Sequence, residues 1–182
     1  MSGDDGKSAV QDGAAEPAGW ALPWAGGCRC GALRFAVTAP PLISVACHCR
    51  GCQRMTGGAF SLTLCLPVDG FAVTKGETRR VGMGAAPWAG PESQALDHRG
   101  CAVCGGWAFT RVADVPDMVT LRATLLDDAG WIRPFAETGM AHGLPWAVGM
   151  AEHGFDDFPP ADAWGPLIAD HAARGARPSR AG

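Results

Sequence analysis

Cysteine is the residue type whose spacing in this sequence most clearly indicates chemistry. Seven of the eight cysteines fall into three glycine-flanked clusters: Cys28 and Cys30; Cys47, Cys49 and Cys52; and Cys101 and Cys104. A structural zinc site uses four protein ligands, whereas a catalytic site uses three and leaves one position for water or substrate. Seven clustered thiols therefore predict two zinc ions per chain, one in a closed site and one in an open site.

Counting decides how the clusters divide between the two sites. The two pairs supply four thiols from distant segments, and the triplet supplies three by itself. Two cysteines at i and i+2 on an extended backbone face the same side, and two at i and i+3 across a glycine-bounded turn also converge, so each pair has chelating geometry. We expect structural zinc on Cys28, Cys30, Cys101 and Cys104, and open, reactive zinc on Cys47, Cys49 and Cys52. Buried thiols without metal and an iron–sulfur site remain alternatives, because cysteine spacing alone does not exclude them.

Alternating apolar residues predict the strands that position these clusters. The first stretch carries Leu33, Phe35 and Val37, and a second runs from Phe60 to Leu66; each indicates a strand with one buried face. Weaker strand signals separated by glycine or proline lie at 71–75, 78–83, 94–98, 107–111 and 118–124. One short helical turn is expected at 50–56, and no long amphipathic helix is expected anywhere. The sequence predicts a mainly β fold of short antiparallel strands.

The two ends of the chain differ in composition from its middle. Residues 1–23 and 161–182 are rich in glycine, alanine, aspartate and proline without a hydrophobic period, which predicts a disordered N-terminal segment and a disordered C-terminal tail. Residues 24–160 are expected to form a single zinc-binding domain. Trp20 and Trp24 are exceptions, because so much aromatic surface usually packs against something.

The cysteine clusters and their neighbours resemble one known family. GGCRCGALRF, CHCRGCQRMTGGAFS and CAVCGG, in this order, are similar to the glutathione-dependent formaldehyde-activating enzymes, a family that includes centromere protein V. The resemblance extends over 26–160 and includes VTLRATLLDD, Pro134 and Trp146. It implies a β-tent fold, structural zinc on the two cysteine pairs and catalytic zinc on the triplet. It also implies carbon–sulfur lyase chemistry, in which glutathione and formaldehyde form S-(hydroxymethyl)glutathione or the reverse.

Two other classes of function remain open. In a non-catalytic zinc module, the triplet would buffer metal or hold a loop for a protein partner. A methionine sulfoxide reductase is a third possibility, but such enzymes typically show two CxxC pairs and a separate reactive cysteine. The CxC and CxCxxC clusters argue against that third class.

Several residues near the clusters could assist the chemistry. His48 points away from Cys47 and Cys49 on an extended chain, so we expect it to pack or support the ligands rather than bind metal. Arg50 and Arg54 could grip a carboxylate of a peptide thiol, although surface arginines are common. Cys65 is expected to be a structural thiol. No spacing ties the remaining acid–base candidates to the cysteines, so solvated side chains are expected for Asp127, Asp128, Glu137, His142 and His153.

Charge and composition exclude some partners. A net charge of −3 and a pI of about 5.9 provide no basic stripe for nucleic acid. The acidic N-terminus does not resemble a signal peptide, and no apolar run reaches membrane-spanning length. We therefore expect a cytoplasmic protein with reduced cysteines, whose partners are a glutathione-like thiol and a small aldehyde, with no nucleic acid and no membrane.

Overall fold

Most alternating stretches of the sequence become strands, and turn residues separate them. A computed structural model describes residues 19–82 and 96–178. The strands of these ranges are β1 Trp24–Gly27, β2 Arg34–Val37, β3 Ile43–Cys47, β4 Ser61–Pro67, β5 Phe71–Lys75, β6 Thr78–Arg80, β7 Leu96–Cys101, β8 Trp107–Val112, β9 Val115–Arg122, β10 Ala136–Thr138 and β11 His153–Gly154. The α-helices are α1 Arg50–Thr56 and α2 Trp164–Arg174, and short 3-10 helices are η1 Val68–Gly70, η3 Ala123–Leu125, η4 Met140–His142 and η5 Ala161–Ala163.

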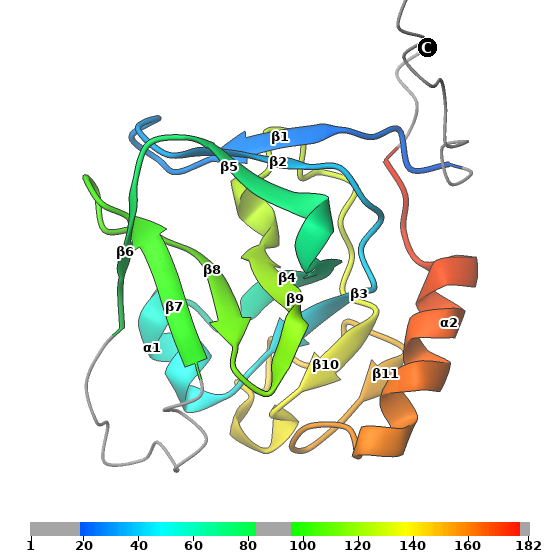
Figure 1. Cartoon of the computed structure of the whole chain (residues 1–182). Helices are drawn as coiled ribbons and strands as arrows, with labels where there is room; N and C mark the ends of the chain where they lie inside the picture. Colours follow the sequence, from blue (N-terminus) through cyan, green and yellow to red (C-terminus); the bar gives the residue numbers. More distant parts are fainter. Residues whose placement is uncertain (1–18, 83–95, 179–182) are drawn as a thin grey trace, which may run out of the picture.

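The strands form two sheets. The smaller sheet has three strands in the order β1-β2-β5, and the larger has eight in the order β11-β10-β3-β4-β9-β8-β7-β6. Pairing is antiparallel except at β10, which runs parallel to both β3 and β11. In Figure 1 the three-stranded sheet lies across one end of the larger sheet. The predicted mainly β fold is confirmed.

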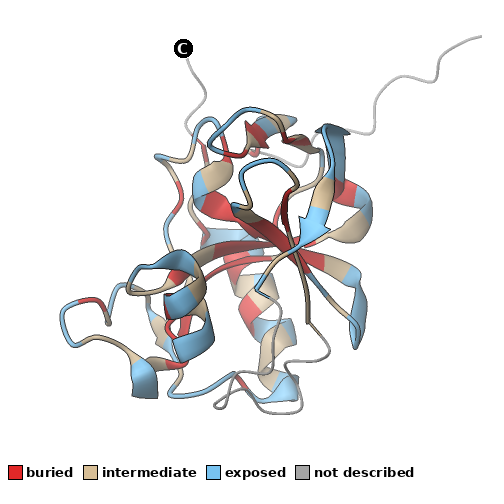
Figure 2. Ribbon diagram, turned by 90° about the vertical axis from the view of Figure 1, so that its left-hand side faces the viewer, coloured by how far each residue is buried: buried red, intermediate tan, exposed pale blue. Residues whose placement is uncertain are grey.

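The main hydrophobic core lies between the two sheets. Phe35 from β2 and Phe71 from β5 pack in one cluster with Leu64, Leu66 and Leu121 of the larger sheet. Leu64 lies opposite Leu121 in the register of β4 and β9, so these side chains share one face of the sheet. Figure 2 shows the buried residues concentrated along the strands at the centre of the molecule. Full burial of each leucine contributes roughly 1.5–3 kcal/mol, which makes this cluster the main source of stability.

Strand β4 is buried on both faces, which corrects the expectation of a single buried face. Its second face carries Ser61, Thr63 and Cys65, and these side chains are 1%, 6% and 7% exposed. The reason is its position, because β4 lies between β3 and β9 near the middle of the eight-stranded sheet. The alternation of apolar and polar residues along a strand identifies its apolar face. It gives no information on which other elements cover the polar face.

Helix α2 covers part of this second face and corrects the expectation of a disordered tail over 161–182. Leu167 of α2 packs in a cluster with Ile43, Val45, Cys65 and Ala136. Figure 1 shows the helix beside β10 and β11, and it also contacts β3. No helix in the described ranges has the length and hydropathy needed to cross a membrane.

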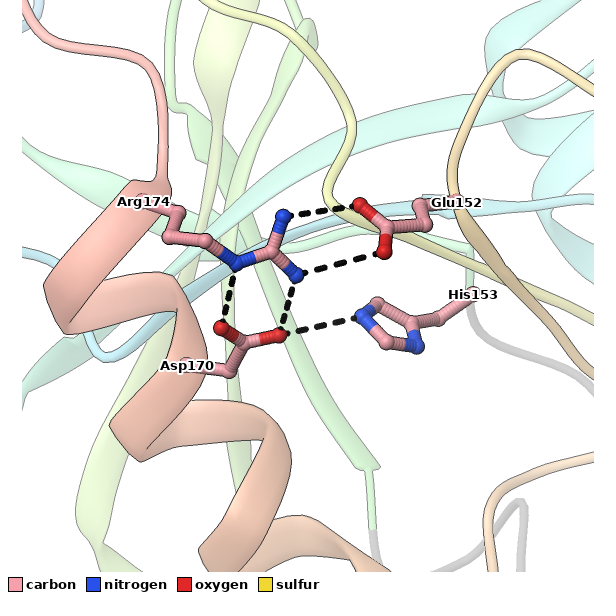
Figure 3. A network of polar contacts seen from close by, with 4 residues as sticks. All are labelled: Glu152, His153, Asp170 and Arg174. Carbon is pink, nitrogen blue, oxygen red and sulfur yellow. Dashed lines mark hydrogen bonds and ion pairs between the residues drawn. The ribbon is translucent and has the colours of Figure 1, made fainter.

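A polar network at the surface ties α2 to the segment before β11. Arg174 donates to Asp170 at 2.6 Å and to Glu152 at 2.9 Å, and His153 lies 3.4 Å from the Asp170 carboxylate (Figure 3). Hydrogen bonding from Arg174 lowers the pKa of both carboxyl groups. The network therefore fixes the position of the last turn of the helix.

The aromatic residues that precede the first cysteine are packed, as expected. Trp20 is 5% exposed, and Trp24 donates its indole N–H to the Trp20 carbonyl at 3.0 Å. Trp131 lies against both rings, and the Arg177 guanidinium lies 3.9 Å from the centre of the Trp20 ring. The folded region therefore begins before residue 24, while residues 1–18 lie outside the described part of the chain.

The other expected elements agree with the structure within a few residues. The helical turn expected at 50–56 is α1, and the segments expected as strands near 33–37 and 71–75 are β2 and β5. The weaker signals correspond to β6, β7, β8 and β9. Four strands were not predicted: β1, β3, β10 and β11. Strand β3 is buried at every position, so its residues do not alternate, and β10 and β11 are only three and two residues long.

Candidate metal centres

The first group of thiols joins the two sheets. Cys28 and Cys30 lie in the turn between β1 and β2, while Cys101 ends β7 and Cys104 lies in the turn before β8. All four sulfur atoms lie within 4.8 Å of one another; Cys28 and Cys30 are 3.4 Å apart, and Cys30 and Cys101 are 3.8 Å apart. A tetrahedron with Zn–S bonds of about 2.3 Å has sulfur atoms about 3.8 Å apart. The group could therefore hold a metal ion with little rearrangement.

Backbone groups stabilise the thiolate form of this group. Burial raises the pKa of Cys28, but the backbone N–H of Leu33 and the thiols of Cys30 and Cys101 act against it, so the pKa falls to about 6. The Leu33 N–H lies 3.3 Å from the Cys28 sulfur. At neutral pH the group thus already carries negative charge, which favours a cation.

The second group of thiols is local in the sequence. Cys47 ends β3, Cys49 is the N-cap of α1, and Cys52 lies in the first turn of that helix. Their three sulfur atoms also lie within 4.8 Å of one another. The backbone N–H of Cys52 points at the Cys49 sulfur at 3.4 Å, as an N-cap bond requires. This group could hold a metal ion with three protein ligands, a number that leaves room for a fourth ligand from solution.

The three thiols of this group share their protons. Hydrogen bonds from Cys47 and Cys52 lower the pKa of Cys49, while hydrogen bonds with Cys47 and Cys49 raise the pKa of Cys52. The negative charge of the metal-free group is therefore concentrated on Cys49. Binding of a metal to all three sulfur atoms must release the remaining protons, so affinity should fall as the pH is lowered.

Segments from much later in the chain hold this loop in place. The Gln53 side chain is 7% exposed and donates to the carbonyl groups of His48 and His142, each at 2.8 Å. Gly139 packs directly on Cys49, since a Cβ atom at position 139 would lie 2.9 Å from the Cys49 backbone nitrogen. Its φ of +67° also favours glycine. The triplet is thus positioned by contacts with η4 and the end of β10.

A buried histidine–glutamate pair lies behind the triplet. His48 and Glu137 are both 0% exposed, and His48 Nε2 lies 2.9 Å from Glu137 Oε1. The other Glu137 oxygen accepts the backbone N–H of Ala151 at 3.0 Å. His48 therefore packs and supports the loop instead of joining the cysteines, as expected. The expectation that Glu137 is solvated was wrong, because its partner lies 89 residues away and no local pattern reveals it.

A cavity of about 390 Å³ opens beside the triplet. Met55 and Thr56 of α1 line it on one side, and Ser61, which lies opposite Cys47 in the register of β3 and β4, lines it on another. Trp107 and Arg122 complete the polar part of its wall. The three cysteines do not line the cavity themselves; α1, which carries Cys52, and Ser61, which pairs with Cys47, connect it to the triplet.

Comparison with known proteins agrees with the resemblance. Residues 23–141, which contain all seven clustered cysteines, match the family described as glutathione-dependent formaldehyde-activating enzyme. The chain belongs to this family. One solved structure, of a Rhodobacter sphaeroides protein studied as a structural genomics target, is 16% identical, covers 72% of this chain and 98% of its own, and has a TM-score of 0.44. None of the curated proteins matches the chain.

The structure places the eight cysteines in three different environments. The seven clustered cysteines lie in the two groups that counting predicts, while their roles as zinc ligands stay predictions. Cys65 lies apart from both groups; it is buried beside Ile43 and Val45, and burial raises its pKa to about 11. It has the environment of a structural thiol.

The candidate acids and bases are not gathered at the triplet. Asp127 forms an ion pair with Arg34, and Asp128 is exposed. His142 is exposed at the end of η4, where its backbone carbonyl accepts from Gln53, and His153 faces Asp170. The structure gives none of these side chains a direct contact with a cysteine sulfur.

The two arginines expected near the triplet lie on α1, and a third was missed. Arg50 and Arg54 are exposed, and Arg50 donates to the side chain of Gln53. Arg122, in contrast, is 7% exposed and lines the cavity. Its position depends on the register of β9 against β4, which is set by pairing between distant segments. A lone arginine at the end of a strand signal gives no local indication of such burial.

Proposed function

We propose that this protein is a zinc-dependent carbon–sulfur lyase or synthase that acts on a thiol and a small aldehyde, with an activity resembling that of S-(hydroxymethyl)glutathione synthase. The observation that carries the proposal is a three-cysteine group beside a cavity, in a chain that also holds a separate four-cysteine group. Membership of the formaldehyde-activating family supports glutathione and formaldehyde as the substrates.

The proposed metal content is two zinc ions per chain. Cys28, Cys30, Cys101 and Cys104 would hold the structural ion, and Cys47, Cys49 and Cys52 the catalytic one. A bound zinc ion would supply a positive, thiol-accepting position that favours the thiolate form of a substrate thiol. All eight cysteines are free thiols, which supports a reducing compartment such as the cytoplasm.

The proposed reaction is an addition that needs no oxidant or reductant. The substrate sulfur forms a bond to the carbonyl carbon of the aldehyde, and the π bond of the carbonyl group breaks. The proton lost by the thiol ends on the carbonyl oxygen. The contribution of the chain is to hold both reactants in the cavity, where Gln53 and Gly139 keep the triplet in a fixed position, so that the two meet in a favourable orientation.

Metal analysis tests the first part of the proposal. Reduced, purified protein should contain two zinc ions per chain by elemental analysis. A reproducible content of one, or iron with visible absorbance, would contradict the proposed division of the thiols.

Exchange spectroscopy tests the reaction itself. NMR measures the rate at which free glutathione and formaldehyde interconvert with their adduct, and the wild-type protein should accelerate this exchange. Cys49→Ser should abolish the acceleration because it changes the charge and affinity of the open group. Cys65→Ala is the matched control, since this cysteine belongs to neither group and should retain the activity. A wild-type protein that binds two zinc ions but leaves the exchange rate unchanged would instead be a non-catalytic zinc module.

A further inference from the structure

Arg122 is a buried cation that has no anionic partner among the described residues. It ends β9, is 7% exposed, and its guanidinium lies 3.9 Å from the centre of the Trp107 ring. Its Nη2 donates only to Thr120, at 3.2 Å to the hydroxyl and 3.5 Å to the carbonyl, and its Nε has no hydrogen-bond partner. Within the described ranges it forms no ion pair with a carboxylate. Burial of an unpaired charge costs several kcal/mol, so such a group usually has a partner that binds it.

The unpaired donor faces the same side of the sheet as the cysteine triplet. In the larger sheet Cys47 lies opposite Ser61, and Arg122 lies opposite Thr63, so all four side chains share one face. The Ser61 hydroxyl is buried and also has no hydrogen-bond partner in the described part of the chain. Ser61 and Arg122 both line the cavity beside the triplet. Two unsatisfied polar groups therefore point to a polar ligand in this cavity.

The electrostatics of the cavity favour an anion. Burial lowers the pKa of Arg122, because it removes water from around the charged guanidinium, and a bound anion would offset this effect. The structure shows no hydrogen bond from the guanidinium to any cysteine, so its donors stay available to a ligand. A planar guanidinium presents paired N–H groups that match the two oxygens of a carboxylate. The Trp107 ring fixes the plane of the guanidinium, which reduces the entropy cost of such a contact.

We propose that Arg122 binds a carboxylate of the substrate thiol, with Ser61 as a second donor, and so makes the site selective for carboxylate-bearing thiols over neutral ones. This inference rests on the proposed function, because it names the recognition group for the thiol substrate. A cavity of about 390 Å³ lies in the range typical of small-molecule sites.

Matched ligands and variants test this role by isothermal titration calorimetry on the zinc-loaded protein. The first ligand pair is 3-mercaptopropionate and 3-mercaptopropionamide, which differ only in the charged group. Arg122→Gln should weaken binding of the carboxylate about 10- to 100-fold and leave the amide unchanged. S-methylglutathione, which has carboxylates but no free thiol, should bind the wild type and lose affinity by a similar factor in the variant.

Control variants separate recognition from folding. Arg111→Gln removes an exposed arginine of the neighbouring strand and should leave all three affinities unchanged. Arg122→Lys is the second variant, to be used if Arg122→Gln fails to fold. It keeps the charge but loses the paired donors, so its affinity for the carboxylate should be intermediate. Equal affinities of the wild type for the two mercapto ligands, or equal losses for both in the variant, would overturn the proposal.

The binding test of Arg122 and the exchange test of the proposed lyase can fail independently of each other. Carboxylate binding that depends on Arg122, in a protein that does not accelerate thiol–aldehyde exchange, would support the anion site and refute the lyase. Accelerated exchange without any preference for carboxylates would support the lyase and refute the anion site.

Discussion

Replacement of Gly139 by alanine should weaken the three-cysteine site without touching the four-cysteine site. The added Cβ would lie 2.9 Å from the backbone nitrogen and 3.3 Å from the Cα atom of Cys49. Contacts this short to backbone atoms cannot be relieved by a rotamer change, so Cys49 must shift. Residues that support metal ligands typically contribute 10- to 100-fold to metal affinity, and a loss of about this size is expected.

A matched control removes the effect of backbone strain. Gly139 has a φ of +67° and Gly149 a φ of +81°, so alanine at either position costs about 1–2 kcal/mol. A Cβ atom at position 149 would meet nothing within 4 Å. Gly149→Ala should therefore lose stability but keep its metal affinity.

Competition with a chromophoric zinc chelator measures the result. The wild type should release its two ions in two steps, with the three-cysteine site emptied first. Gly139→Ala should shift the first step to lower chelator concentration by about 10- to 100-fold and leave the second in place. Identical curves for Gly139→Ala and Gly149→Ala would refute the reasoning, as would a shift confined to the second step.

Two further predictions concern stability. Cys30→Ser should unfold or aggregate the protein and Cys49→Ser should leave it folded, as measured by thermal melting, because metal binding across distant segments supplies about 10 kcal/mol against a total stability of about 5–15 kcal/mol; equal melting losses would contradict this. Hydrogen bonding from Arg174 holds the pKa of Asp170 below its ordinary 3.8. The Asp170–Arg174 ion pair therefore stabilises the folded state above pH 3.8, and this contribution is lost as the pH falls through the lowered pKa. The Trp20 indole packs against His171 of α2, so its NMR signal should change as the pH falls through that range. If the same change occurred in Arg174→Gln, the ion pair would be excluded as the cause of the transition.

The sequence predicted those features that depend on neighbouring residues. Alternation around Phe35 located β2, and the cysteine spacing located both thiol groups, because ligands that bind one ion must be close in three dimensions. Helix α2 also had a local signal that was missed: Trp164, Leu167, Ile168 and His171 follow the i, i+3, i+4, i+7 pattern of an apolar face. Gly165 and Pro166 lie in the first helical turn, where a proline is tolerated, but they make the segment look like a loop.

The features that the sequence did not predict depend on strand register and on long-range pairing. Arg122 is buried because β9 pairs with β4, and Glu137 is buried because β10 runs parallel to β3 and brings it to His48. Neither pairing follows from the residues nearby. Polar groups whose environment is set by distant segments are therefore the ones that sequence reasoning misses, and here they include the residue assigned to substrate recognition.

The supports of the cysteine triplet are made late in protein synthesis. Its three thiols emerge from the ribosome together, but Glu137 and His142, which pack behind His48 and Gln53, follow 89 residues later. During that interval the growing chain carries a cluster of unprotected thiols. These thiols are then open to oxidation and to capture of the wrong metal ion. We expect correct loading in a cell to depend on the thiol and zinc status during translation, so the yield of active protein should respond to oxidative stress during synthesis more than after it.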